Sequence, residues 1–405
     1  MGMGGAARPA FAALVLCQVM GALADNALLL AALGLLADRA TAAWTAPALR
    51  VAYFLPCLVL AAWAGAVADA FAKPRVMLAA LVLKLAGCAL LLAGLHPVLA
   101  FGLMGLGAAP YGASRYGILP ELLAPGELVG ANAWIEGSTV LAILGGAGLG
   151  GWLLQRAHGW PRMDTPAMSA TACVALLYAL AVLAAALMPG RRPAAAHVAV
   201  SGPLWPRFLA AARLLRQDRQ ACLAMAVTCL FWAIAAALQF IVLRWAVDVL
   251  GLRLAEAAWL QVALGGGIIA GAVAAARLVG LADCRRLLPL GLAIGVLVAL
   301  MLLVKDVFVT AAMLVAIGAL SGMLLVPMNA LLQARGSLLM PAGQSVAVQN
   351  FYENLAAVLA LAGYGALTLL GMPLAAIIGG FAMLIVLATL ALIGFERARG
   401  AARPA

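Results

Sequence analysis

Charged side chains are scarce in this chain. Only 10% of its 405 residues are Asp, Glu, Lys or Arg, whereas a soluble globular domain averages about 25%. Hydrophobic residues make up 67% of the sequence, and the mean hydropathy is +1.13. This balance excludes an ordinary soluble domain and indicates a protein that crosses the membrane many times. The net charge of +11 is then attributed to cytoplasmic loops rather than to a nucleic-acid surface.

The sequence also lacks the residue patterns of an enzyme. It has three histidines (His96, His158 and His197), no HExxH motif, no P-loop, and no Ser, His and Asp set at one membrane depth. An integral membrane enzyme and an ATP-hydrolysing pump are therefore excluded. The cysteines fall within or at the ends of apolar segments without metal-like spacing, which predicts packing roles and no cofactor or metal: Cys17, Cys57, Cys88, Cys173, Cys222, Cys229 and Cys284.

Apolar runs separated by Pro, Gly and charged residues predict an all-α protein with twelve transmembrane helices. An Arg-rich connector at 189–219 divides them, so we expect six-helix bundles at 1–188 and 220–405. The predicted spans are 11–36, 47–68, 76–95, 97–119, 128–154, 168–188, 220–247, 256–279, 287–304, 307–331, 342–370 and 372–394.

The distribution of basic residues predicts the orientation. Sixteen of the 25 Lys and Arg residues fall on the side of the connector and both termini, six fall on the other side, and Lys84, Arg244 and Arg277 lie within spans. Because Lys and Arg accumulate in cytoplasmic loops, both termini and the connector are expected in the cytoplasm.

The two halves resemble each other in sequence. A shift of 217 positions aligns three pairs of residues, and a slightly smaller shift aligns residues 67–69 with 281–283, each followed by basic residues. This order favours a parallel duplication with a site between the halves near the midplane. The aligned pairs are Pro110 with Pro327, Asn132 with Gln349, and Glu136 with Glu353.

The most unusual polar residues are Asp25 and Asn26, in the middle of the run 11–36. A carboxylate at the centre of a spanning helix costs roughly 2.5–3.5 kcal/mol on insertion scales. Such a residue faces protein or a water-filled cavity, so we interpret the pair as part of a substrate or ion site. The alternative is a structural carboxylate paired inside the bundle.

Polar residues recur at helical spacing in two further spans. Asn132 and Glu136 lie four residues apart and therefore share a helix face, and Gln349, Asn350 and Glu353 repeat the pattern. They are candidate binding residues, or else they join helices by hydrogen bonds. A further candidate is Arg115 at the end of the fourth span, for which a cytoplasmic anchor is the simpler explanation.

A loop motif follows the second span. Gly65 permits close helix approach, Asp69 can cap a neighbouring helix N-terminus, and Lys73 and Arg75 hold the loop in the cytoplasm. The motif resembles the loop signature of the major facilitator superfamily, which marks the fold and not the substrate.

Longer pieces resemble the bacterial lysophospholipid transporters of that superfamily. They are ADNALLL (24–30), VADAFAKPRVM (67–77), SRYGILPEL (114–122), LVGANAWIEGSTVLAIL (128–144), VPMNALLQARG (326–336) and AVQNFYEN (347–354). The resemblance implies a monomeric flippase of the bacterial inner membrane, working by alternating access with a lateral opening. It would move lysophosphatidylethanolamine from the outer to the inner leaflet, where an acyltransferase on the cytoplasmic face would reacylate it.

The chain departs from that family at two candidate residues. Arg115 stands where the family has Lys, and Gln239 stands where it has Arg. The cation of the seventh span is Arg244, five residues later and rotated by about 140° around the helix. Our hypothesis is that Asp25 binds the ammonium of the head group and Arg244 its phosphate, with Lys84 as second choice.

Simpler explanations exist for both cations. Arg244 can pair with Asp248 near the outer end of its span, and Lys84 can extend its side chain to the membrane interface. For the whole protein, the alternatives are an ion-coupled exporter of drugs or other small amphiphiles, with Asp25 as the titrating group, and a passive scramblase.

Overall fold

A computed structural model describes residues 7–38, 45–156, 165–189 and 203–401. Helices account for nearly all of these ranges, and no strand occurs within them, so the predicted all-α class is confirmed. Three short 3-10 turns interrupt the helices, namely η1 (Pro125–Glu127), η2 (Leu281–Leu287) and η3 (Met301–Leu303).

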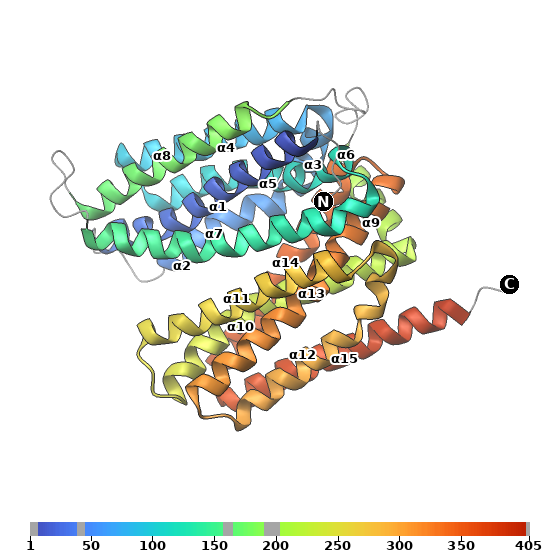
Figure 1. Ribbon diagram of the computed structural model, residues 1–405. Coiled ribbons are helices and arrows are strands. Elements are labelled where there is room, and N and C mark those ends of the chain that lie inside the picture. Colours follow the sequence, from blue (N-terminus) through green and yellow to red (C-terminus); the bar gives the residue numbers. More distant parts are fainter. Residues whose placement is uncertain (1–6, 39–44, 157–164, 190–202, 402–405) are drawn as a thin grey trace. The chain divides into compact units, whose positions relative to one another are not determined.

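The helices follow the predicted spans closely (Figure 1). Eight precede the Arg-rich connector, one lies in it, and six follow it. They are α1 (Ala7–Asp38), α2 (Thr45–Val59), α3 (Ala61–Ala70), α4 (Lys73–Leu92), α5 (Pro97–Gly117), α6 (Leu119–Leu122), α7 (Leu128–Arg156), α8 (Pro166–Ala186), α9 (Leu204–Gln217), α10 (Arg219–Asp248), α11 (Leu254–Leu278), α12 (Pro289–Leu300), α13 (Val307–Leu339), α14 (Ala342–Leu369) and α15 (Leu374–Ala401).

Within the described ranges, nine helical stretches are long and apolar enough to cross a membrane. The pair α2 and α3 forms a tenth span that is bent by 63°, so the predicted span 47–68 is not one straight helix. Pro56 lies inside α2 just before the break, and proline removes a helical hydrogen bond. The remaining two predicted spans correspond to α5 and α14, which are less apolar than the other spans. α5 is rich in Gly, and α14 begins with a polar stretch.

The chain forms two compact units, which we describe separately. Unit 1 comprises Met1–Ala124, Ser138–Leu214 and Gly336–Phe351, and unit 2 comprises Pro125–Gly137, Leu215–Arg335 and Tyr352–Ala405. Both α7 and α14 therefore contribute residues to each unit. The sequence predicts a different division, into two six-helix bundles with boundaries near residues 188 and 220. That division stays a prediction.

In unit 1, α1 packs along α8, α4 packs against α5 and α8, and α2 packs against α5 (Figure 1). Small residues bring the backbones together. A Cβ atom added to Gly105 of α5 would clash with the backbone carbonyl oxygen of Tyr53 in α2. Close backbone contact of this kind is typical of membrane helices, which associate by packing rather than by the hydrophobic effect. It places α2 near α1, α4 and α8, where the polar candidates lie.

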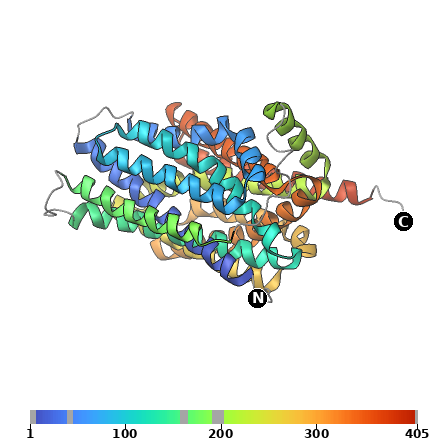
Figure 2. The same ribbon diagram turned by 90° about the horizontal axis from the view of Figure 1, so that it is seen from above.

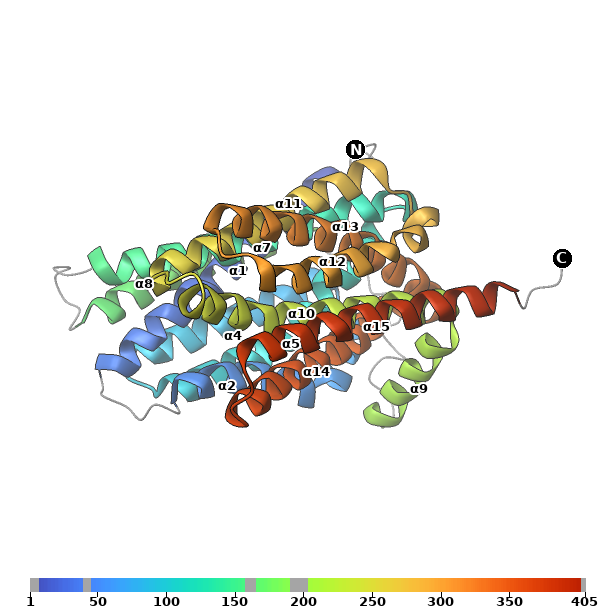
Figure 3. The ribbon, with the colours of Figure 1, turned by 90° about the horizontal axis from the view of Figure 1, so that it is seen from below.

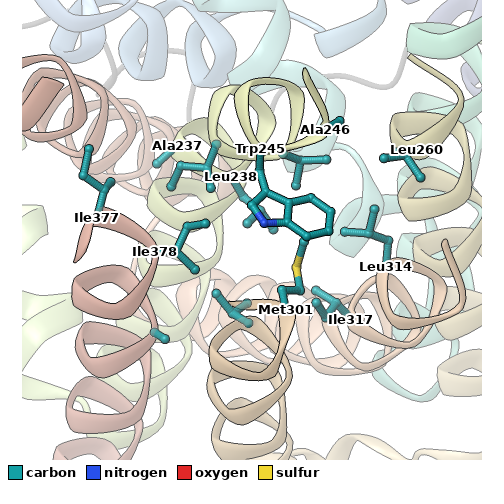
Figure 4. Packing of buried hydrophobic residues seen from close by; sticks show 14 of the residues in the cluster. Ala237, Leu238, Trp245, Ala246, Leu260, Met301, Leu314, Ile317, Ile377 and Ile378 are labelled. Carbon is teal, nitrogen blue, oxygen red and sulfur yellow. The ribbon is translucent and has the colours of Figure 1, made fainter. Parts of the chain in front are cut away.

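In unit 2, α12 runs along α15, and α10 contacts α11 and α15 (Figure 3). Their shared core is apolar and is centred on Trp245 of α10, which is 1% exposed and lies beside Met301 and Leu314 (Figure 4). A neighbouring apolar cavity of about 60 Å³ is lined by α10, α11, α12, α13 and α15. The core of unit 2 around Trp245 is thus apolar.

Candidate functional site

The candidate site of unit 1 is centred on Asp25 in α1. The Lys84 Nζ of α4 lies 2.7 Å and 2.9 Å from the two Asp25 carboxylate oxygens. The hydroxyls of Tyr53 in α2 and Tyr178 in α8 also donate to this carboxylate, at 3.1 Å and 2.6 Å. Four helices therefore converge on one acid, which accepts hydrogen bonds from one ammonium and two phenols.

Lys84 is held inside the bundle by the same groups. Its side chain is 2% exposed, its Nζ donates to the Tyr53 hydroxyl at 3.2 Å, and it lies over the rings of Tyr53 and Tyr111 at 5.6 Å and 5.3 Å. The suggestion that Lys84 extends to the membrane interface is therefore wrong. The reason is electrostatic, because a carboxylate and two aromatic faces stabilise the ammonium where it is.

Desolvation makes this pair costly to keep. Removing two charges from water is only partly repaid by their attraction, and breaking a buried pair by removing one partner costs about 3–5 kcal/mol. Asp25 keeps 24% of its side-chain surface exposed while Lys84 keeps almost none. The carboxylate is consequently the part of the cluster that a ligand would reach first.

Two other predicted residues lie near this cluster. Asn26 donates through Nδ2 to the Ala22 carbonyl oxygen of its own helix at 2.8 Å. The guanidinium of Arg115 lies 4.3 Å from the centre of the Tyr116 ring and within electrostatic reach of Tyr111. Arg115 is half-buried and follows Tyr111, whose ring lies beneath the Lys84 Nζ, by about one helical turn. It therefore adds positive charge near the cluster.

Asn132 and Glu136 pair with α13 inside unit 2. Asn132 and Gln333 exchange two amide hydrogen bonds of 2.9 Å, and Asn329 donates to the Glu136 carboxylate at 3.1 Å. All four side chains are at least 97% buried. Sequence reasoning missed Asn329 and Gln333, although their four-residue spacing in VPMNALLQARG repeats the spacing of Asn132 and Glu136.

The equivalent residues of α14 lie against different helices. Gln349 is 3% exposed. Asn350 lies against Gly112 of α5, because a Cβ atom added to Gly112 would be 3.0 Å from the Asn350 Nδ2. Glu353 lies in unit 2, within electrostatic reach of Cys229 in α10. The polar residues of α14 therefore form a second polar region, against α5 and α10.

Gln239 and Arg244 lie on α10 in unit 2. The Gln239 side chain is exposed, and the backbone carbonyl oxygen of Gln239 accepts a hydrogen bond from the Gln261 Nε2 of α11 at 3.0 Å. The Arg244 Nε lies 3.2 Å from an Asp248 carboxylate oxygen, and Tyr364 is also a hydrogen-bond partner of Arg244. Arg244 therefore pairs with Asp248, as the simpler explanation for this arginine predicts.

The loop motif contacts the start of α14 within unit 1. Both Asp69 carboxylate oxygens accept backbone hydrogen bonds of 2.7 Å, from the N–H groups of Gly343 and Gln344. This is the capping arrangement that the sequence suggests, since free N–H groups at a helix start favour a negative charge. A Cβ on Gly65 would lie 2.9 Å from Ala347, which explains the glycine.

The basic residues of that motif differ in their surroundings. Lys73 is buried, lies 3.5 Å from an Asp69 carboxylate oxygen and also pairs with Glu121, whereas Arg75 is exposed. Lys73 is therefore part of the cap, and Arg75 is left to interact with solvent or lipid.

A second charged cluster joins helix ends in unit 2. Asp218 caps α10 by accepting from the Ala221 N–H at 2.9 Å and pairs with Arg335 of α13. Burial alone would raise the pKa of Asp218, but the hydrogen bonds from Arg335 and the helix N–H groups hold it below its usual value. Arg219 and Arg285 both pair with Glu396 of α15.

Metal chemistry has no support in the part of the chain that is described. No group of three or more His, Cys, Asp or Glu side chains there could hold a metal ion. The polar clusters consist of ion pairs, amides and phenols, which suit recognition of a polar organic group.

Comparisons with known proteins agree with this architecture. The family model of the Major Facilitator Superfamily matches residues 10–361. The lysophospholipid transporter LplT of Yersinia pestis (strain Pestoides F) is 41% identical over 371 residues, covering 90% of this chain and 88% of the relative. The relative with this name from Yersinia pseudotuberculosis serotype O:3 (strain YPIII) shows the same identity and coverage.

Solved structures show the same fold at low sequence identity. The transporter FucP in the outward conformation gives a TM-score of 0.74 at 14% identity, covering 96% of this chain and 98% of that chain. The human organic anion transporter MFSD10 gives 0.72 at 17% identity, covering 96% and 100%. The chain therefore belongs to the lysophospholipid transporter family of the Major Facilitator Superfamily, whose members are membrane transporters and not enzymes.

Proposed function

We propose that the protein moves lysophospholipids, first of all lysophosphatidylethanolamine, from the outer to the inner leaflet of a bacterial inner membrane. An acyltransferase on the cytoplasmic face would then reacylate them. The sequence relationship over 90% of the chain supports the substrate class. The proposal includes a monomer with both termini in the cytoplasm and alternating access with a lateral opening for the acyl chain.

The buried Asp25–Lys84 pair is the observation that supports head-group binding in unit 1. Phosphoethanolamine carries a cation and an anion a few bonds apart. It can insert into the pair, with its ammonium on Asp25 and its phosphate on Lys84. Each protein charge then exchanges one partner for another of the same sign, so no unpaired charge is left in the membrane interior.

The hydroxyls of Tyr53 and Tyr178 support this exchange. They donate to Asp25 from α2 and α8, and they can keep the carboxylate partly satisfied while the ammonium partner changes. In this proposal Lys84 takes the phosphate-binding role first considered for Arg244. Arg115 adds positive charge nearby, and Asn26, Gln239, Gln349, Asn350 and Glu353 stay candidates for contacts in other states of the cycle.

The test is head-group-resolved uptake of labelled lysolipids by cells that lack their own transporter. The wild-type chain should import lysophosphatidylethanolamine, and Asp25→Asn should lose most uptake at normal membrane abundance. The control is Asp248→Asn, which removes the acid of an exposed ion pair at the end of α10. Uptake by the Asp25→Asn variant at the wild-type rate would refute the site assignment, and no uptake by the wild type would refute the substrate.

An ion-coupled exporter with Asp25 as proton acceptor is the second candidate. Its support is that Asp25 is the partly accessible acid of a membrane-embedded cluster. It predicts that Asp25→Asn stops drug efflux and acid-driven transport while lysolipid uptake is absent in the wild type. The same cell line can be used for both assays.

A further inference from the structure

The connector helix α9 has two faces of different character. Phe208, Ala211, Ala212 and Leu215 are buried, at the spacing of one helix face. Phe208 and Trp205 both contact the ring of Phe351 in α14, at centroid distances of 5.4 Å and 6.5 Å. Gln344 of α14 also donates to the Arg207 carbonyl oxygen at 3.3 Å. One face of α9 is therefore fixed to unit 1.

The adjoining face, which begins at the partly exposed Trp205, is both apolar and basic. Trp205 and Leu209 are 44% and 48% exposed, and Arg213 and Arg216 are exposed beside them. At 100° per residue these four positions fall within about 80° of the helix circumference. Across the described ranges, neither Arg213 nor Arg216 forms an ion pair, and α9 contains no acidic residue.

The helix also has its own direction. Figures 2 and 3 show α9, coloured yellow-green, inclined to the long helices of unit 1. A short amphipathic helix between two membrane spans lies close to the bilayer surface, because α8 ends and α10 begins there.

We propose that this exposed face of α9 binds anionic phospholipid head groups at the membrane surface, with Trp205 and Leu209 inserted at the boundary of the acyl chains. Arg213 and Arg216 contact phosphate oxygens of those lipids. Aromatic and leucine side chains beside arginines on one helix face match such a surface, and each basic residue near an anionic membrane adds to the attraction.

The proposal is tested by photo-crosslinking of the full-length protein in lipid nanodiscs. In one sample, p-benzoylphenylalanine replaces Leu209. In the other sample it replaces Ala210, which is also exposed and is rotated by about 100° around the helix from Leu209. The discs contain phosphatidylcholine alone or with phosphatidylglycerol, and lipid adducts on the peptide 204–217 are quantified by mass spectrometry.

The probe at 209 should give about tenfold more phosphatidylglycerol adduct than the probe at 210. Arg213→Gln with Arg216→Gln should remove that excess, whereas Arg277→Gln, at an exposed arginine of α11, should not. Thermal unfolding and elution volume verify that each variant is folded. The same two probes are also used in native membranes. Three outcomes would each overturn the proposal: equal adduct yields at 209 and 210, yields that do not depend on phosphatidylglycerol or on the two arginines, and crosslinks to a protein in the native membranes.

Discussion

The Asp25–Lys84 cluster of unit 1 and the Trp245 core of unit 2 differ in chemistry. The shift of 217 that aligns Pro110 with Pro327 carries Asp25 to Val242 and Lys84 to Met301. In unit 1 those positions form a hydrogen-bonded ion pair, and in unit 2 they are buried apolar residues packed around Trp245 (Figure 4). The two positions of unit 2 that the shift aligns with the pair are therefore filled without charge.

This difference argues that the Asp25–Lys84 pair is kept for function. Replacing a buried ion pair by apolar residues of similar volume is often neutral or stabilising, and unit 2 has residues of that kind at the positions that the sequence shift aligns with the pair. A charged interior that packing does not require is consistent with recognition of a charged head group. Five changes test or sharpen this comparison.

The largest effect is expected from making unit 1 resemble unit 2. Lys84→Met leaves Asp25 without its ammonium and should lower the free energy of unfolding by about 3–5 kcal/mol and abolish lysolipid uptake. Adding Asp25→Val should recover most of the stability and none of the uptake. Thermal unfolding in detergent and uptake in cells measure the two quantities, and a double variant that transports would show that the pair is dispensable.

Next, Trp245→Ala removes the centre of the apolar core of unit 2. The free energy of unfolding should fall by about 3–5 kcal/mol through the cavity that remains. Because no charge of the head-group site changes, the apparent KM of the protein that stays folded should be that of the wild type. A changed head-group preference would show that unit 2 takes part in selecting the substrate.

A smaller effect is expected from the phenols. Tyr178→Phe and Tyr53→Phe each remove one hydrogen bond to Asp25, worth about 1 kcal/mol of stability. Uptake should fall partially in each and further in the double variant. Tyr364→Phe, a phenol beside Arg244 in unit 2, is the matched control, and an equal loss of uptake there would argue against a specific role for the Asp25 phenols.

Arg244→Ala should change uptake little. The arginine pairs with Asp248 at an exposed position, and exposed pairs contribute little to stability. The sharper variant is Gln239→Arg with Arg244→Leu, which restores the cation arrangement of the family. Loss of uptake in Arg244→Ala that this double variant rescues would move the phosphate-binding role from Lys84 to α10.

The smallest effect concerns the cap at Asp218. Its pKa in the folded protein is lowered, so its stabilising contribution is complete above the unfolded pKa of about 3.9 and is lost as the pH falls through the lower folded value. Asp218→Ala should cost about 1 kcal/mol at neutral pH. The difference in unfolding temperature between the variant and wild type should shrink in acid, and a difference that grows would contradict the assignment.

The sequence by itself determined the class of the molecule. Long apolar runs with few charges leave helices as the way to satisfy backbone hydrogen bonds in lipid, and the polar residues in them had to face protein. The motif pieces, from ADNALLL to AVQNFYEN, were sufficient to indicate the family. The cap by Asp69 could also be anticipated, because a carboxylate among small residues suits a helix N-terminus.

Only the tertiary structure decided which charges meet. Asp25 and Lys84 are 59 residues apart, and Asp25 and Tyr178 are 153 apart, so no local spacing reveals their contact. Likewise, Asn132 and Gln333 are 201 residues apart and pair because α7 and α13 come together in one unit. Helical periodicity assigns a residue to a face, but the partner of that face is set by packing of helices that are distant in the chain.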